Sequence, residues 1–546
     1  MQRRQFLLWA LGGTSALALG VSLYEEEEIA NLSEHEKPHD LLLGALIPVL
    51  LEGALPEINK HRSSAINRTL DAANQTLKWL PKAQRQELEQ LLDILENRFG
   101  LLLLSGSMTP LMLRSPNELV EMLESWRSSW MELLQQAYLG LRELLMASYY
   151  ACLSIGTDST ITSQNWHSDT RLETHLPIAD PILAGLAAGW KHTDGASLTE
   201  DLELETDVVI IGTGAGGGTA AEVLTQAGLR VLLLEAGPLK SSSDFVMEER
   251  RAYPELYQQA AAMKTLDKGI GIFQGKSVGG STTVNWTTSI RTPKATLDYW
   301  QSLGVKGLSR SELDPWFDKM EQRLNISRWP IDPNRNNQAL RDGCVALGWD
   351  YTVIKRNVLG CWNTGYCGMG CPVNAKQSML VTTIPAALNA GAELYSHVRA
   401  ERFEHHGERV FALRAEALNG YNKPTGVKLM IRARHYVVAA GAIHTPALLL
   451  RSQMTDPYQR LGKQTCLHPT VLSGARFREA INAHSGAPQS IYSDQFVWQD
   501  GATGQPGYKL EVPPVHPVLI ASKTLGYGPQ HAELMSWFNH LQVTIA

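Results

Sequence analysis

Three glycines and one glutamate have the spacing of a dinucleotide-binding unit. Gly212, Gly214 and Gly217 form the pattern G-x-G-x-x-G directly after the apolar run "DVVII", and Glu235 ends the next apolar run, "RVLLLE". In such a unit the first glycine permits a tight turn, the second lets the backbone approach a pyrophosphate, and the third lets a helix pack against the strand. Glu235 would accept hydrogen bonds from ribose hydroxyls and repel a 2'-phosphate, which disfavours NADP. A purely structural glycine turn is the alternative, but strand, glycines, helix, strand and acid in this order favour a dinucleotide.

Two further segments have side chains or backbone suited to the same ligand. The stretch "GKSVGGSTTVNWTTSIRTP" (275–293) contains a Gly279-Gly280 pair, three hydroxyl residues and then Asn285. Paired glycines let the backbone come close to a ligand, and the hydroxyls add hydrogen-bond donors. A third stretch, "HYVVAAGAIHTPALLLRS" (435–452), indicates another strand and turn.

Together with "EAGP" (235–238), these segments resemble the glucose–methanol–choline (GMC) family of FAD-dependent oxidoreductases. The resemblance runs from about residue 207 to the end of the chain. A weaker one, in "LLLGALIPVLLEGALPE", is to the long-chain alcohol oxidase branch. The resemblance to the GMC family and its branch implies an α/β fold: a Rossmann-like FAD domain built from separated segments, an α+β substrate domain, and an added all-helical N-terminal domain.

The resemblance also implies a cofactor site. The residues it assigns to FAD are Gly212, Gly214, Gly217, Gly218, Glu235 and Ala236 at the ADP half, Gly279, Gly280 and Asn285 at the flavin side, Val398 at the adenine, and Ala440 and Gly441 at a turn near the dinucleotide. Some family members bind the flavin covalently through a histidine just before the asparagine. This chain has Val284 there, so non-covalent FAD is expected.

The family chemistry is oxidation of a CH–OH group, with a histidine base taking the alcohol proton and hydride passing to flavin N5. A primary or long-chain alcohol is the substrate that the branch resemblance favours, and the electron acceptor would be oxygen, a quinone or a protein. No family-like histidine motif is found, so the catalytic residues are unassigned; His468 is interpreted as structural and His540 as a surface residue. The chain is therefore expected to be truncated or split, with its last run "LQVTIA" a strand that lacks a neighbour. The alternatives are an FAD-binding but inactive remnant, one half of a split enzyme, or an NAD-dependent dehydrogenase.

Three cysteines form a cluster at x5 and x3 spacing. Cys361, Cys367 and Cys371 could ligate zinc or an iron–sulfur cluster, with Cys344 or Cys466 as a fourth ligand, but neither spacing is C-x2-C. A structural loop or one disulfide is favoured, and no metal site is expected.

The N-terminus has the order of an export signal. Arg3-Arg4 precede an apolar run and a small-residue stretch, Ala16-Leu17-Ala18, which resembles a twin-arginine signal and predicts a periplasmic protein. An uncleaved anchor helix, with membrane association, is the alternative. A net charge of -6 and the lack of a basic tract argue against nucleic-acid binding.

The expected domain organisation follows from these segments and from a helical pattern before them. In that pattern Ser115 and Glu118 predict a capping box, followed by an apolar stripe that includes Trp126 and Trp130. The expected segments are a signal (1–22), a helical domain (40–156), a linker (157–205), FAD-binding segment 1 (206–300), a substrate or cap segment with the cysteine loop (301–380), FAD-binding segment 2 (381–455) and a partial substrate domain (456–546).

Overall fold

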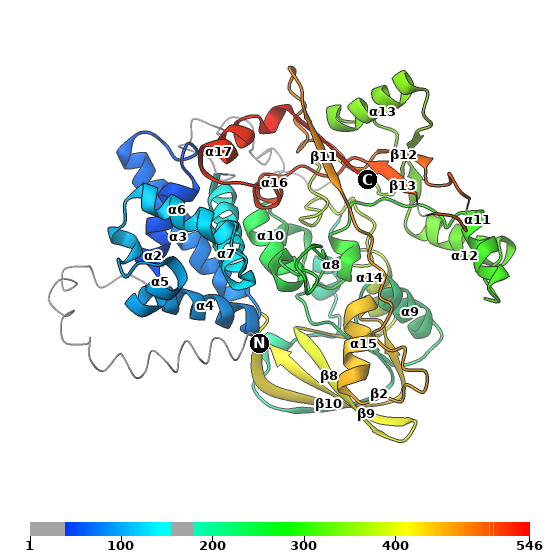
Figure 1. The fold of residues 1–546 in the computed structure, drawn as a ribbon. Coiled ribbons are helices and arrows are strands. Elements are labelled where there is room, and N and C mark those ends of the chain that lie inside the picture. Colours follow the sequence, from blue (N-terminus) through cyan, green and yellow to red (C-terminus); the bar gives the residue numbers. More distant parts are fainter. Residues whose placement is uncertain (1–38, 154–178, 502, 506) are drawn as a thin grey trace. The chain divides into compact units, whose positions relative to one another are not determined.

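The computed structural model describes residues 39–153 and 179–546, except 502 and 506 (Figure 1). The expected signal lies outside these residues. The described chain divides into two compact units, which we call the helical unit and the sheet unit. The helical unit consists of the described residues up to 153 together with Pro517–Ser536; the sheet unit contains the rest. In the described residues we find no helix long and apolar enough to cross a membrane.

The helical unit occupies the region in which helices were expected, and it also contains two helices from the far end of the sequence (Figure 1). Its helices are α2 (Asp40–Leu50), α3 (Asn59–Trp79), α4 (Lys82–Glu96), α5 (Arg98–Ser105), α6 (Pro116–Arg127), α7 (Glu132–Leu153), α16 (Pro517–Lys523) and α17 (Gly528–Ser536). The apolar side of α2 is buried, with Leu43, Leu46 and Ile47 fully covered.

Local sequence signals set the start and end of α6. Ser115 and Glu118 form the predicted capping box: the Ser115 Oγ accepts from the Glu118 N–H at 3.4 Å, and the Glu118 carboxylate accepts from the Ser115 N–H at 2.7 Å. Trp126 is fully buried and donates its indole N–H to the Leu104 carbonyl at 2.7 Å. Trp130, expected on the same buried stripe, is 92% exposed, because α6 ends at Arg127 and the helical periodicity ends with it.

Residues Pro517–Ser536, expected in the substrate domain, complete the helical unit instead. In α16, Val518, Ile520 and Ala521 are buried, and the helix packs against α7. Arg142 of α7 is 3% exposed and donates from Nε to the Gly526 carbonyl at 2.6 Å and from Nη2 to the Thr524 carbonyl. The assignment of this segment to the substrate domain is therefore wrong: it folds with helices made about 400 residues earlier.

The sheet unit is organised around a seven-stranded sheet with the order β1-β7-β3-β2-β10-β9-β8. The strands are β1 (His192–Asp194), β2 (Leu202–Ile211), β3 (Val231–Leu234), β7 (Glu393–Ser396), β8 (Val398–His406), β9 (Arg409–Leu418) and β10 (Pro424–Val438). Neighbours from β1 through β10 are parallel, and β10-β9-β8 is an antiparallel meander.

Both faces of this sheet are covered, which explains the continuous apolar runs of β2 and β3. Val208 and Ile210 point to the face packed by α9 (Ala215–Gln226) and α14 (Thr383–Asn389). Val209 and Ile211 point to the other face, where they meet β8, β9 and α15 (Gly441–Arg451). The α/β fold with a Rossmann-like β2–α9–β3 unit is as predicted.

Part of the expected linker is ordered structure. Residues 181–187 form α8 (Pro181–Ala187), and residues 192–194 form the edge strand β1 of the large sheet. The Asp180 carboxylate caps α8 by accepting from the Ile182 N–H at 2.8 Å, and it also accepts from the Ser242 N–H at 2.6 Å. The linker prediction is therefore wrong from Pro181 onward. A seven-residue helix and a three-residue strand are too short to show periodicity in the sequence.

The sheet unit also contains four further helices and two smaller sheets. They are α10 (Glu249–Leu256), α11 (Lys294–Ser302), α12 (Arg310–Arg323), α13 (Arg335–Leu347), a small β4–β6 pair (Ile326–Arg328 and Lys355–Asn357), and a five-stranded sheet, β11-β14-β13-β12-β5. That sheet contains β5 (Thr352–Val353), β11 (Leu472–Arg476), β12 (Ile491–Phe496), β13 (Tyr508–Glu511) and β14 (Leu541–Ile545). The "LQVTIA" run is the predicted strand, but β14 pairs with β11 along its length and with β13 at its end, so the expectation that it lacks a neighbour is wrong.

Candidate FAD site

The glycine turn between β2 and α9 has the geometry that its sequence predicts. Gly212 has φ +95°, in the left-handed region that favours glycine. A Cβ on Gly217 would lie 1.9 Å from the Gly212 carbonyl oxygen, so α9 can approach the end of β2 only with glycine at this position. A Cβ on Gly218 would lie 2.7 Å from the Thr383 Oγ1, which fixes the packing of α9 on α14.

The N-terminus of α9 is open to a ligand. Its N-cap, Gly214, offers no side chain to the first-turn N–H groups, and Ala215 and Gly216 are exposed. The helix dipole and these N–H groups favour a negatively charged group at this end. The second glycine segment lies directly against the turn, because a Cβ on Gly280 would be 2.7 Å from the Gly214 Cα.

Glu235 and Thr213 join the two glycine segments. The Thr213 hydroxyl donates to the Glu235 Oε2 at 2.7 Å and accepts from the Gly279 N–H at 3.1 Å, although Thr213 and Gly279 are 66 residues apart. The Glu235 carboxylate also accepts from the Thr213 N–H at 3.1 Å and the Gly237 N–H at 3.0 Å. Its side chain is 8% exposed and therefore fixed in place, with lone pairs left for ribose hydroxyls. Thr213 was not among the residues expected from the sequence.

The flavin-side segment presents Asn285 beside two buried residues. Asn285 is exposed, whereas Thr283 and Val284 beside it are buried. The Lys376 Nζ donates to the carbonyl oxygens of Thr283 at 2.7 Å and Asn285 at 2.8 Å. This ammonium therefore holds the backbone that presents Asn285.

The other expected FAD residues lie at the ends of neighbouring strands. The Val398 N–H donates to the Glu235 carbonyl at 2.9 Å, so Val398 adjoins the acid that ends β3, and Ala236 follows that acid. Ala440 and Gly441 follow β10, the strand on the other side of β2, and Gly441 is exposed with φ +77°. Because carboxyl ends of parallel strands meet at one edge of a sheet, these residues converge on the glycine turn.

Two basic side chains near this edge were missed from the sequence. Burial lowers the pKa of Lys276 to about 8, against the raising effect of the nearby Glu235 carboxylate. Burial also lowers the pKa of His444, and the charge of Lys276 adds to that effect. The His444 Nε2 is buried without a hydrogen-bond partner among the described residues. A phosphate-bearing ligand would supply a negative charge near both side chains and a hydrogen-bond partner for the His444 Nε2.

These observations together fit FAD. The open glycine turn, the uncapped α9, the fixed carboxylate of Glu235 and the neighbouring basic groups match an ADP moiety, and the second glycine pair extends the site toward Asn285. Val284, 5% exposed, cannot form the covalent bond that a histidine could form.

The histidines considered as catalytic candidates lie elsewhere. His468 is exposed in a run of exposed residues, 462–470, and His540 is half-buried beside Trp537. A third histidine, His516, was not considered: it is 1% exposed, and its ring lies against Trp286 at 6.3 Å and Tyr366 at 5.2 Å between centroids. Burial lowers its pKa to about 3, so the imidazole is neutral.

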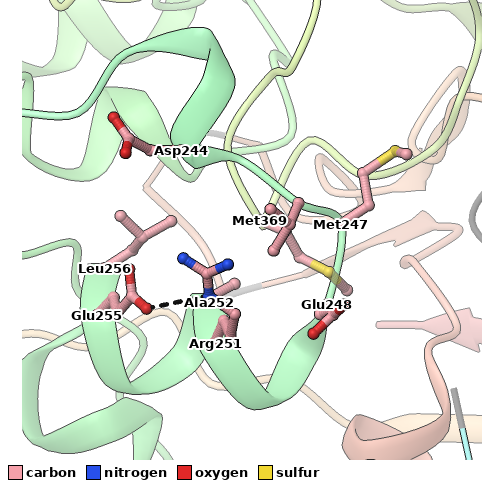
Figure 2. A pocket seen from close by; sticks show the side chains of 9 residues that line it. Asp244, Met247, Glu248, Arg251, Ala252, Glu255, Leu256 and Met369 are labelled. Atoms are coloured by element: carbon pink, nitrogen blue, oxygen red, sulfur yellow. Dashed lines mark hydrogen bonds and ion pairs between the residues drawn. The ribbon is translucent and has the colours of Figure 1, made fainter. Parts of the chain in front are cut away.

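A small hollow in the sheet unit lies beside α10 (Figure 2). It is lined by Asp244, Val246, Met247, Glu248, Arg251, Ala252, Glu255, Leu256 and Met369. The Arg251–Glu255 ion pair, at 3.3 Å, lies within it. Because none of the residues expected to bind FAD lines it, we assign this hollow no role in the cofactor site.

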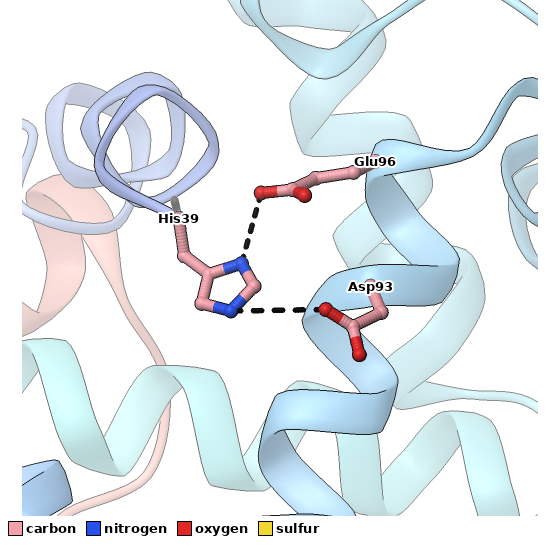
Figure 3. A group of neighbouring side chains, drawn as sticks. All are labelled: His39, Asp93 and Glu96. Carbon is pink, nitrogen blue, oxygen red and sulfur yellow. Dashed lines mark hydrogen bonds and ion pairs between the residues drawn. The ribbon is translucent and has the colours of Figure 1, made fainter. Parts of the chain in front are cut away.

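One group of metal-ligating side chains occurs in the helical unit (Figure 3). The His39 Nδ1 lies 2.8 Å from a Glu96 oxygen and its Nε2 lies 3.8 Å from an Asp93 oxygen. The two ring nitrogens thus face different carboxylates, as Figure 3 shows, which is the arrangement of a surface ion pair. The cysteines form no such group in the described residues, and none of the six, all of which lie in that part of the chain, takes part in a disulfide of the kind weighed from the sequence.

Comparisons with known proteins agree with this site. Residues 207–246 match the model of an FAD binding domain, and residues 253–470 match that of GMC oxidoreductases. An uncharacterised GMC-type oxidoreductase of Sinorhizobium fredii is 35% identical over 53% of this chain and 57% of its own length. A long-chain-alcohol oxidase of Arabidopsis thaliana is 32% identical over 52% of this chain and 38% of its own length. A formate oxidase of Aspergillus oryzae, a solved structure, aligns with a TM-score of 0.43 and 15% identity over 64% of this chain and 73% of that chain.

The chain thus spans about half the length of the curated relatives it matches. Two adjoining family models cover the glycine turn, the flavin-side segment, the cysteine segment and the "AAG" turn, and identities of 30–35% to curated relatives extend over 52–60% of the chain. On this evidence residues 253–470 of the chain match the GMC oxidoreductase family, and residues 207–246 match an FAD-binding domain.

Proposed function

We propose that this protein is an FAD-dependent oxidoreductase that oxidises a CH–OH group. The observation that carries the proposal is the hydrogen-bonded link Glu235–Thr213–Gly279, which joins the turn expected to bind the ADP half to the segment expected at the flavin. When bound, FAD would accept a hydride at its flavin ring. The protein's own part is to hold the ADP end at Gly212, Gly217 and Glu235 and to present Asn285 beside the flavin.

The proposed substrate is a primary, long-chain or otherwise apolar alcohol. The Arabidopsis relatives named as long-chain-alcohol oxidases support this class, at 29–32% identity. We propose that FAD is bound non-covalently, because Val284 offers no nucleophile. A further proposal is export to the periplasm, which rests on the Arg3-Arg4 signal-like sequence alone. The proposed electron acceptor is oxygen, a quinone or a protein.

The test begins with the purified protein and its visible absorption spectrum. Acid precipitation should release the flavin into the supernatant, and intact mass should match the polypeptide alone. Under anaerobic conditions 1-dodecanol should bleach the flavin, and glucose should do so much more slowly. A colourless protein that binds NAD would contradict the proposal, and flavin that stays with the precipitate would contradict non-covalent binding.

A second candidate function is FAD binding without turnover of alcohol by this chain alone. It is favoured by the positions of His468, which is exposed, and His540, which lies beside Trp537. It predicts a yellow protein that dithionite reduces but no alcohol bleaches. The same anaerobic titration therefore separates the two candidates.

A further inference from the structure

The cysteine segment lies against two buried cations. Arg356 of β6 is fully buried; it donates from Nη1 to the Pro488 carbonyl at 2.5 Å and from Nη2 to the Cys367 Sγ at 3.5 Å. Its guanidinium lies 5.0 Å from the centre of the Trp329 ring, and its Nε has no hydrogen-bond partner among the described atoms. A guanidinium this deeply buried needs compensation for its lost hydration.

The second cation, Lys376, is 3% exposed. Besides Thr283 and Asn285, its Nζ donates to the Cys367 carbonyl at 2.6 Å. In the described part of the chain, every hydrogen-bond partner of the two cations is a neutral carbonyl oxygen, except the Cys367 sulfur. Two buried positive charges thus meet one group that can become an anion.

The three cysteines of the segment differ in their surroundings. Burial raises the pKa of the Cys361 thiol to about 11 and raises that of Cys371 as well. All three side chains are half-buried, and Cys367 is the one whose sulfur contacts a guanidinium. Thiols that are partly exposed and next to a cation are those that react. The other titratable groups facing it are Tyr257, Lys376, Cys361 and Cys371.

We propose that Cys367, whose sulfur lies against the Arg356 guanidinium, is a reactive cysteine and a modification site for soft electrophiles such as alkyl halides. In alkylation the Cys367 sulfur forms a bond to the electrophilic carbon, the halide leaves with its electron pair, and the thiol proton passes to water. No part of this requires bound FAD. Where the proposed function also holds, modification would disturb Asn285, because Lys376 binds the Cys367 and Asn285 carbonyls at once.

The test uses iodoacetamide on the purified full chain, with peptide mass spectrometry of each cysteine over time. Cys466 is exposed and serves as an internal reference for an accessible thiol in the same molecule. We expect Cys367 to be labelled at least tenfold faster than Cys466, and Cys361 and Cys371 to be labelled last. Arg356→Met should slow labelling of Cys367 about tenfold and leave Cys466 unchanged, whereas Arg356→Lys should keep most of the rate.

Three outcomes would overturn the proposal. One is labelling of Cys367 only after unfolding; another is labelling of Cys367 no faster than that of Cys466. The third is iron or zinc in the purified protein with all three cysteines of the segment protected until the metal is removed. If Arg356→Met fails to fold, the ratio of the Cys367 and Cys466 labelling rates in the unaltered protein decides alone. A flavin spectrum recorded alongside separates failure of this proposal from failure of FAD binding, since labelling is read without it.

Discussion

The two compact units differ in how far apart in the chain their contacting segments lie. In the sheet unit, the turn expected to bind the dinucleotide is formed by residues 207–235, which are contiguous in the chain. The glycines and the acid in this stretch are the residue types that their positions require. In the helical unit, the helices up to α7 are joined by α16 and α17, which come from residues 517–536. The first arrangement can be recognised in a short window of sequence, and the second cannot, because its decisive contacts join residues more than 380 positions apart.

The difference has a physical basis. A glycine at positive φ or against a backbone carbonyl is constrained by its neighbours in the chain, so the constraint is visible in the local sequence. An apolar helix such as α16 has no local feature that says which surface it covers. We call contacts within one short stretch of the chain a local closure, and contacts between distant segments a remote closure. The comparison can be tested with variants that disrupt each of them separately.

The largest effect is expected from Gly217→Val, which breaks the local closure. Its Cβ would meet the Gly212 carbonyl oxygen at 1.9 Å, and no rotamer can relieve a collision between backbone atoms. Overpacking of this kind costs about 3 kcal/mol or more, and FAD content should fall at least tenfold. The measurements are the flavin-to-protein absorbance ratio and the urea unfolding midpoint.

The matched control is Gly216→Ala in the same turn. Gly216 is exposed, and a Cβ there would lie 4.0 Å from the Ala439 Cβ, an ordinary contact. FAD content should therefore stay near that of the unaltered protein. Equal losses in the two variants would mean that the turn does not depend on close packing at Gly217.

The next effect is expected from Arg142→Met, which breaks the remote closure. The change removes both hydrogen bonds to the Gly526 and Thr524 carbonyls, which are half-buried, at a cost of about 2–3 kcal/mol. Trypsin should then cleave after Lys523, at the end of α16, more rapidly. Cleavage rate and the urea midpoint measure the two consequences.

Arg127→Met is the control for removing an arginine from the helical unit. Arg127 is exposed and pairs with Glu124 three residues earlier, a contact that contributes only a few tenths of a kcal/mol. If Arg142→Met behaved like this control in both measurements, residues 517–536 would not be needed to complete the unit.

The smallest effect is a pH dependence at Lys376, where three segments of the sheet unit meet. Burial lowers its pKa to about 8 in the folded protein, from an ordinary 10.5. Between these values the unfolded chain binds more protons, so this group makes the free energy of unfolding rise with pH, by about 1–2 kcal/mol from pH 8 to 10. Below pH 8 the penalty for the buried charge is present in full.

Urea midpoints at pH 7.5, 8.5 and 9.5 measure this slope. Lys376→Met should remove the corresponding part of the rise, whatever its effect on overall stability. Lys355→Met, at an exposed position of the same β6 strand, should leave the slope unchanged. A slope unaltered in Lys376→Met would show that burial of the Lys376 ammonium does not lower the free energy of unfolding.

The sequence predicted the elements whose constraints are local. The β2–α9–β3 unit, the Ser115–Glu118 cap and the β14 strand are where they were expected. It did not predict the end of α6 before Trp130, because apolar periodicity continues past the residue at which the helix stops. The Asp180-Pro181 pair was a usable helix-start signal for α8, and it was passed over in a stretch rich in loop residues.

The residues of the candidate site also divide into those that local sequence identifies and those that only remote contacts identify. The glycines, Glu235 and Asn285 could be assigned from spacing and resemblance, whereas Thr213, Arg356, Lys376 and His516 could not. Each of these four acts through a contact with a segment 9 to 230 residues away, and nothing in its immediate neighbours sets it apart. Buried cations without carboxylate partners in particular are visible only in three dimensions.

Because the helical unit includes residues 517–536, it can be completed only late in the synthesis of the chain. The ribosome finishes α7 at Leu153, but the partner segment is complete only at Ser536. At about 5–20 residues per second, the helices made first must wait roughly 20–80 s for α16 and α17. During that interval the side of α7 that α16 will cover is exposed, so the earliest helices emerge first and are completed last. A chaperone that shields apolar helices would have its longest opportunity there.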